Sequence, residues 1–257
     1  MNSMMNLIAI IIAHSLNIAN IQTARMDNWT TGQNPASLVE LYSFQMAATY
    51  ENHYMNHALH TATIQSAYCS QYINVGVGFS FFGYSKYQEM MAGITLSKKF
   101  GRFSLGIQAN YITIYCGDYL KYKGTFIPEL GCIINITPTF NLGFWTFNPF
   151  LQKIQVIEQE KRNLPSIYSI GTDYLFHPDI RWGVQFDYDI FSSWRIASNI
   201  EWKCCDILIL KLGAYYKDNI VGCLGMELMF DKWGLNQLYE YNSLLGFSSQ
   251  TCIYYHL

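Results

Sequence analysis

Apolar and polar residues alternate with a period of two through most of the chain, beginning near residue 42. From Ile180 to Tyr188, for example, every second residue is aliphatic or aromatic, and the residues between them are Arg, Gly, Gln and Asp. Successive side chains of a strand point to opposite faces of a sheet, so this alternation predicts strands with one apolar and one polar face. The sequence therefore predicts an all-β protein.

We expect about 14 strands of this kind. They cover residues 42–52, 61–70, 73–82, 88–98, 102–115, 121–136, 139–147, 166–176, 180–190, 193–204, 207–217, 219–230, 235–243 and 247–257. Most have about 9 to 12 residues, the length that a tilted strand needs to cross the hydrocarbon core of a membrane. Strands of globular proteins are usually nearer to about 5 or 6 residues. The lengths therefore favour a membrane-spanning β-barrel.

The expected connections alternate in length along the chain. Every second connection is a tight turn, as at residues 71–72 and 99–101, whereas the other set includes the long segment 148–165. Outer-membrane barrels have short turns on the periplasmic side and longer loops outside, so the pattern agrees with this architecture. The asymmetry is partial, because the connections at 218–219 and 245–246 are also short.

The composition supports a barrel and excludes several other classes. Only 13% of the residues are charged, whereas 51% are apolar and 16% are aromatic. The longest strongly apolar run, Leu7 to Ala13, is far shorter than the roughly 20 residues of a membrane-spanning helix. The net charge is −2 and no basic cluster is longer than Lys98-Lys99, which argues against a nucleic-acid partner.

A soluble β-sandwich is the competing architecture, since its strands alternate in the same way. The outward polar face of a sandwich would be rich in Lys and Glu, whereas here the polar face is rich in Gly, Ser, Asn and Gln. The large aromatic residues Trp182, Phe186, Trp194 and Trp202 lie on the apolar face. We therefore expect a transmembrane antiparallel barrel that turns this face toward lipid.

The first 24 residues have features of an export signal. A short apolar stretch at residues 7–16 is followed by small and polar residues as far as Ala24, although no positive charge precedes it. We expect residues 1–24 to be a signal peptide and residues 42–257 to form the barrel. The alternative for the N-terminus is a buried helix of a soluble domain.

Several motifs resemble one family of outer-membrane barrels. The segment Asp27-Asn28-Trp29, followed by Gln33-Asn34-Pro35-Ala36-Ser37-Leu38, resembles the N-terminal segment of FadL-like and PorV/PorQ-like barrels. The stretches Phe82 to Glu89 and Phe100 to Gln108, and the pair Asn148-Pro149, recur in the same order as in that family. The resemblance implies a 14-stranded barrel in the outer membrane of a Gram-negative-type envelope.

The resemblance also implies that residues 25–41 fold into the lumen, with Trp29, Asn34 and Pro35 as the plug residues. An X-Pro pair favours an extended Asn34, and Asn readily forms a local turn, so the Asn34-Pro35 element could anchor a plug or could be the turn before the first strand. The segment is too short for a full FadL-type hatch domain, and the chain ends on Leu257 where a terminal aromatic residue is common.

Polar residues between the apolar positions are candidates for the lumen lining. They are Arg102, Gln108, Asn110, Glu129, Arg181, Gln185, Asp187, Arg195, Asn199, Glu201, Lys203, Lys211 and Glu227. They could guide a solute or hold the N-terminal segment. The alternative is an internal network of ion pairs that fills the lumen, since unpaired charge is unfavourable in a partly dry interior.

No sequence motif points to enzymatic chemistry. Nucleophile elbows, HExxH, Walker and GxGxxG patterns are missing, and the seven cysteines lack metal-ligand spacing. His53, His57 and His60 lie near one another in an expected external loop, but such proximity is weak evidence for a metal site. We expect no catalytic residues, no metal and no cofactor.

Two hypotheses for the function remain open. The first is transport of small hydrophobic molecules across the outer membrane, or an accessory role in protein export similar to type IX secretion, with a secretion-system protein as partner. The second is a non-conducting structural barrel whose outer loops bind a partner; the charged segment 148–165 is the candidate loop, although an ordinary solvated loop is the simpler interpretation. In both hypotheses the barrel is surrounded by outer-membrane lipid.

Overall fold

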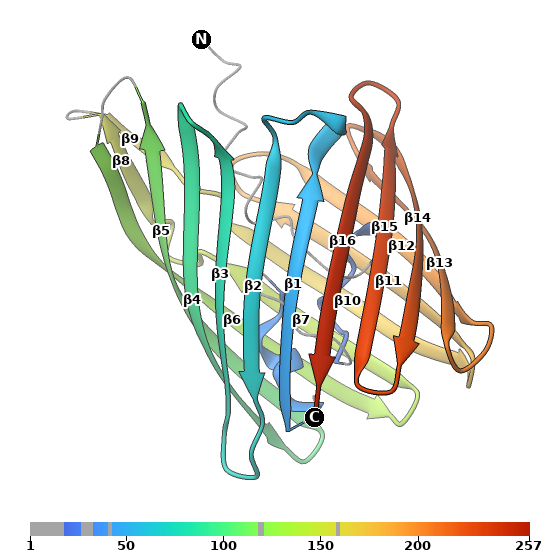
Figure 1. Ribbon diagram of the computed structural model, residues 1–257. Coiled ribbons are helices and arrows are strands. Elements are labelled where there is room, and N and C mark those ends of the chain that lie inside the picture. The colour runs from blue at the N-terminus through green and yellow to red at the C-terminus, as the bar shows by residue number, and fades with distance from the viewer. Residues whose placement is uncertain (1–17, 27–32, 41–42, 118–120, 158–159) are drawn as a thin grey trace.

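Fourteen strands form one closed antiparallel barrel in the computed structural model, which describes residues 18–26, 33–40, 43–117, 121–157 and 160–257 (Figure 1). Strands that are neighbours in the sequence pair with each other, and β1 pairs with β16 to close the barrel. The one exception is the pairing of β7 with β10, across a separate two-stranded sheet of β8 and β9. This result confirms the predicted fold class.

The barrel strands are β1 (Phe44–Asn52), β2 (His60–Tyr68), β3 (Asn74–Tyr84), β4 (Tyr87–Phe100), β5 (Phe103–Cys116), β6 (Lys121–Thr137), β7 (Phe140–Phe147), β10 (Ile167–His177), β11 (Ile180–Asp189), β12 (Trp194–Lys203), β13 (Leu208–Lys217), β14 (Asn219–Phe230), β15 (Trp233–Asn242) and β16 (Gly246–His256). The remaining elements are β8 (Lys153–Ile157), β9 (Glu160–Asn163) and the short 3-10 turns η4 (Ile18–Asn20), η5 (Pro35–Glu40) and η6 (His53–Met55). Among the described residues, no helix is long and apolar enough to cross a membrane.

The expected strands agree with the observed strands to within a few residues at each end. The sequence did not predict the β8–β9 hairpin, which lies in the expected loop 148–165. These two strands have five and four residues, too few to produce a clear alternation. Ile154 of β8 is buried among side chains of the barrel.

The two faces of the wall differ in the way that the alternation predicts. Phe186 and Trp202 point outward and are 41% and 52% exposed, whereas Gln185 and Glu201 point inward and are 1% and 4% exposed. The outward face therefore presents apolar and aromatic side chains, and the inward face carries most of the polar ones. A barrel with this arrangement is built to be surrounded by lipid.

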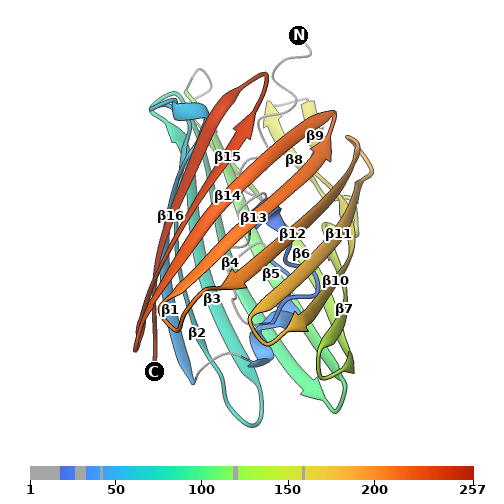
Figure 2. The same ribbon diagram turned by 90° about the vertical axis from the view of Figure 1, so that its right-hand side faces the viewer.

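The described parts of the N-terminal segment lie inside the barrel (Figures 1 and 2). We use the name lumen segment for residues 18–26 and 33–40. Its first part, η4, contacts β12, β13 and β14, and its second part, η5, contacts β3, β4, β5 and β6. The segment thus touches opposite walls of the lumen. Ala24, the expected end of the signal peptide, is buried within the same segment.

Candidate functional site: a plugged lumen

A row of glycines on the inner face of the wall receives the lumen segment. We call this row the glycine belt: Gly106, Gly131, Gly143, Gly171, Gly183 and Gly213. At Gly143 an added Cβ atom would lie 2.0 Å from the carbonyl oxygen of Thr23, and at Gly106 it would lie 2.3 Å from the carbonyl carbon of Pro35. Both atoms belong to the backbone, so only glycine allows this close approach.

Asn34 anchors the centre of the lumen segment. Its side-chain nitrogen donates to the carbonyl oxygens of Phe144 at 3.1 Å and of Thr23 at 2.6 Å, and its side-chain oxygen accepts from the backbone nitrogen of Ala36 at 3.0 Å. The bond to Ala36 is a local Asx turn that leads into Pro35 and η5. The structure therefore places Asn34 and Pro35 in the lumen, against Gly131 and Gly106 of the wall, and their role as plug residues stays a prediction. Trp29, the third expected plug residue, lies outside the described residues.

Charged and amide side chains on β11 and β12 hold the first part of the segment. The side-chain oxygen of Gln185 accepts from the backbone nitrogens of Gln22 at 2.8 Å and Thr23 at 3.0 Å. Arg195 donates to the carbonyl oxygens of Ala19 and Asn20, at 2.8 and 3.0 Å, and pairs with Asp187 at 2.7 Å. Since these bonds satisfy backbone groups of an irregular segment, they fix its position in the lumen.

Two buried ion pairs lie beside this contact. Arg25 of the lumen segment donates to both carboxylate oxygens of Glu201, at 2.5 and 2.7 Å. Lys211 pairs with Glu227 at 2.7 Å, and both side chains are almost fully buried. A bidentate arginine–carboxylate pair is directional as well as strong, so Arg25 and Glu201 tie the segment to β12 in one orientation.

A hydrogen-bonded network on β4 to β7 surrounds Glu129 above the segment. Glu129 is fully buried and accepts from Asn110 at 2.5 Å, from Gln108 at 3.2 Å and from the indole nitrogen of Trp145 at 2.9 Å. Its charge is therefore compensated by donors rather than by a cation. Gln108, Asn110 and Glu129 all lie on the lumen face, as expected, and Trp145 was not among the candidates.

The other candidates for the lumen lining lie in different surroundings. Asn199 is buried on β12 and contacts Glu201, and Arg181 lies half-buried, 3.8 Å from Asp173. Arg102 does not line the lumen: it lies exposed in the turn between β4 and β5. Lys203 ends β12 and pairs at the barrel rim with the exposed Asp206 at 2.9 Å. Alternation alone does not show where a strand ends, so both residues were placed too deep.

Apolar side chains fill the lumen at the end of the barrel that carries the long connections. This mouth cluster consists of Phe82, Met91, Ile112, Ile114, Ile127, Trp145, Phe147, Ile154 and Leu164. Most of its members come from β3 to β7, but Ile154 and Leu164 belong to the segment between β7 and β10. That segment therefore packs Ile154 and Leu164 into the mouth and is not merely a solvated loop.

Asn148 fixes the segment between β7 and β10, and we call its described residues, 148–157 and 160–165, the covering segment. Its side-chain nitrogen donates to the carbonyl oxygens of Gln152 at 3.2 Å and Pro165 at 3.1 Å, and its side-chain oxygen accepts from the backbone nitrogen of Gln152 at 2.7 Å. The carbonyl oxygen of Asn148 also accepts from the hydroxyl of Ser166 at 3.0 Å. Both ends of the covering segment are thus held by one residue.

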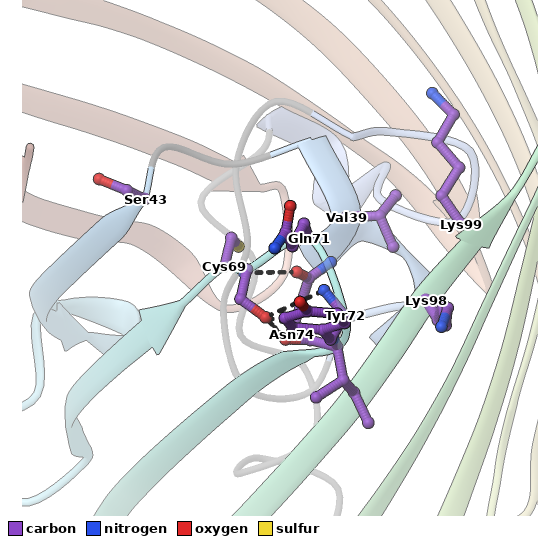
Figure 3. Close-up of a pocket in the computed structure, with 10 residues that line it drawn as sticks. Val39, Ser43, Cys69, Gln71, Tyr72, Asn74, Lys98 and Lys99 are labelled. Carbon is purple, nitrogen blue, oxygen red and sulfur yellow. Dashed lines mark hydrogen bonds between the residues drawn. The ribbon is translucent and has the colours of Figure 1, made fainter.

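A small cavity lies at the opposite end of the barrel, beside the last residues of the lumen segment (Figure 3). It has a volume of about 260 Å³ and lies between Val39 of η5, the β2–β3 turn and Lys98 and Lys99 of β4. Cys69 donates its thiol hydrogen to the carbonyl oxygen of Leu38 at 3.1 Å and so links the turn to η5.

A second hollow lies on the outer surface of the wall. This groove of about 470 Å³ crosses β6, β7, β10 and β11 and is lined mainly by outward side chains such as Leu130, Phe144, Tyr168 and Phe186. It also reaches Trp145, a member of the mouth cluster.

Among the described residues, no group of His, Cys, Asp and Glu could hold a metal ion. His53, His57 and His60 are among the residues searched.

Comparison with known proteins finds similar folds but no match in sequence. No family model and no curated protein matches the sequence. A mutant of the TodX monoaromatic hydrocarbon channel is similar in structure, with a TM-score of 0.65 and 10% identity over 95% of this chain and 97% of that chain. The CymD monoaromatic hydrocarbon channel has a TM-score of 0.58 and 8% identity, over 86% of this chain and 89% of that chain.

The outer membrane protein Omp33 of Acinetobacter baumannii is also similar, with a TM-score of 0.56 and 9% identity over 84% of this chain and 98% of that chain. The fold is that of an outer-membrane β-barrel. Identities this low show the fold alone. They do not show membership of the FadL-like or PorV/PorQ-like family, so that resemblance stays a prediction from the sequence.

Proposed function

We propose that the chain resides in the outer membrane of a Gram-negative-type envelope and passes small hydrophobic molecules inward from its external mouth. The main support for this proposal is the mouth cluster. A water-filled pore has a polar lumen, whereas here nine buried apolar residues occupy the lumen where a solute would enter. Such a lining favours apolar solutes over ions and sugars, because it cannot replace the hydrogen bonds that those solutes make with water.

One further observation supports an apolar route. Two of the similar structures are described as monoaromatic hydrocarbon channels. The lumen segment contacts opposite walls of the lumen, and Ile154 and Leu164 pack into the mouth cluster, so passage along the barrel axis requires both to move.

The test is uptake by Gram-negative host cells that express the full chain, with labelled toluene and a labelled monosaccharide as the two probes. We expect toluene uptake above that of cells without the chain, and no gain for the sugar. The Ile127→Asp variant places a charge in the mouth cluster and should abolish the gain. The matched control Thr49→Asp adds a lumen-facing charge on the opposite wall and should retain it.

Equal toluene uptake with and without the chain would refute transport, provided that the barrel is folded in the outer-membrane fraction. Folding is checked by gel mobility, since a folded barrel migrates compactly until it is boiled. Sugar uptake equal to toluene uptake would instead indicate an ordinary polar pore.

A non-conducting structural barrel is the second candidate, and one observation favours it. The lumen segment is bound by the pair Arg25–Glu201 and by Arg195, so the lumen is closed by paired charges. In this case neither probe would enter cells faster than in the control. Its partner, or a secretion-system protein for an export role, would be sought by co-purification from the native envelope, with the covering segment deleted as the control.

A further inference from the structure

One carboxylate in the mouth cluster lacks a complete set of donors. Glu89 on β4 is fully buried, and its register neighbours are Phe82 on β3 and Ile114 on β5. One of its oxygens accepts from the hydroxyl of Tyr87 at 2.5 Å. The other oxygen, Oε2, has no hydrogen-bond partner among the described residues.

The surroundings of Oε2 make this unusual. A buried polar atom without a partner is rare and costs free energy, more so for a carboxylate. Trp145 is the one member of the mouth cluster with a hydrogen to donate, and its indole nitrogen donates to Glu129. Of the nearest cations along the strands, Lys86 is exposed in the β3–β4 turn and Lys123 lies beyond Ile114, opposite it on β6. Neither forms an ion pair with Glu89.

Other buried carboxylates of the lumen are satisfied, which sets Glu89 apart. Glu129 accepts from three donors. Glu240, on the opposite wall, accepts from the hydroxyl of Tyr215 at 3.3 Å and from the thiol of Cys223 at 3.8 Å. A carboxylate with one free acceptor inside an apolar cluster is the arrangement of a ligand site, where few polar groups fix the orientation of an apolar molecule.

We propose that Glu89 and the mouth cluster bind small aromatic molecules that carry one hydroxyl group, such as phenols. The ligand donates its O–H to Oε2, and its ring packs between Phe82 and Ile114. This inference rests on the proposed function and narrows its substrate class from hydrophobic molecules to those with an apolar body and a single donor.

The covering segment competes with the ligand for the mouth cluster. Ile154 and Leu164 belong to the same cluster and fill its apolar part, but an aliphatic side chain leaves Oε2 without a donor. A phenol replaces both the apolar contacts and the missing hydrogen bond. The ligand therefore competes with these two side chains for the cluster, and an aromatic hydrocarbon without a hydroxyl competes less well.

The test is equilibrium dialysis of labelled p-cresol and labelled toluene against the folded, detergent-solubilised full chain. Glu89→Leu removes the acceptor and keeps the volume, and Glu240→Leu is the matched control on the opposite wall. We expect Glu89→Leu to lower the ratio of p-cresol affinity to toluene affinity by about fivefold, the usual contribution of one hydrogen bond. Glu240→Leu should leave the ratio unchanged.

An unchanged ratio in Glu89→Leu overturns the inference and indicates that Oε2 holds only water. Toluene binding without any effect of Glu89 leaves the proposed function intact, whereas binding of neither probe to the wild-type chain removes the support for both. If Glu89→Leu does not fold, Glu89→Met is used instead. It also lacks an acceptor oxygen at this position, so the ratio should fall in the same direction.

Discussion

Replacing Gly143 with Ala should unseat the lumen segment without changing the barrel wall. The new Cβ atom would lie 2.0 Å from the carbonyl oxygen of Thr23, far inside an ordinary contact distance of about 3.5 Å. The backbone around Thr23 must then move by on the order of 1 Å. Gly222 on β14 is the matched control, because a Cβ atom there meets no other atom within 4 Å.

The size of the effect follows from the contacts near Gly143. Overpacking of this kind usually costs about 1 to 3 kcal/mol. A shift of the segment also threatens the hydrogen bond from Asn34 to the carbonyl oxygen of Phe144, which is already 3.1 Å long. A cost in this range raises the ratio of displaced to seated segments by roughly 5- to 150-fold.

Limited digestion with trypsin measures this ratio directly. Arg25 is 5% exposed and paired with Glu201 while the segment is seated, so cleavage after Arg25 requires displacement. When displacement is fast compared with cleavage, the rate follows the displaced population. We expect cleavage after Arg25 in folded Gly143→Ala to be faster than in the wild type by roughly 5- to 150-fold, and Gly222→Ala to match the wild type.

Equal cleavage rates in Gly143→Ala and Gly222→Ala would refute the role of the glycine belt. A faster rate in both variants would show that the wall itself had loosened. In either case the close contact between Gly143 and Thr23 would not determine the position of the lumen segment.

Three further predictions concern other parts of the chain. Phe186→Arg places a charge on the lipid face of β11 and should lower barrel stability by about 2 to 4 kcal/mol in a urea refolding titration, whereas Phe186→Leu should cost less than about 1.5 kcal/mol. N-terminal sequencing of the mature chain should show that it still contains Ile18; a mature chain that starts after Ala24 would lack the contacts of η4 and contradict its place in the lumen. The hydrogen bond from Lys203 lowers the pKa of Asp206. The ion pair is therefore fully formed above the usual pKa of an aspartate and is lost as the pH falls through the lowered pKa of Asp206. Lys203→Met should return the Asp206 pKa toward its usual value in an NMR titration, and no change would mean that the pair is absent in solution.

The barrel could be predicted from the sequence because each strand carries its own signal. The alternation in residues 180–190 places Phe186 outside and Gln185 inside without reference to any other strand, and the observed exposures agree. Strand number, strand length and facing follow from this local rule. The ends do not, which is why Arg102 and Lys203 were assigned to the lumen.

The interior could not be predicted in the same way because it depends on contacts between distant residues. Nothing in the residues near Ile154 shows that this side chain turns into the mouth, since the apolar cluster that receives it comes from β3 to β7. The lumen segment was placed by resemblance, but its extension to Ile18 was missed. A usable signal was present: glycines such as Gly131 and Gly183 recur at lumen-facing positions, where a barrel filled only by side chains would not need them.

The position of the lumen segment constrains the order in which the barrel is assembled. The segment precedes β1, and β1 pairs with β16 to close the wall, so it must be inside before the first and last strands meet or must enter later through an open end. Its partners are far away in the chain: Arg25 and Glu201 are separated by 176 residues. Such a contact carries a large loop-closure cost until β12 is in place. The plug is therefore synthesised before the strands that bind it and is among the last parts to be bound.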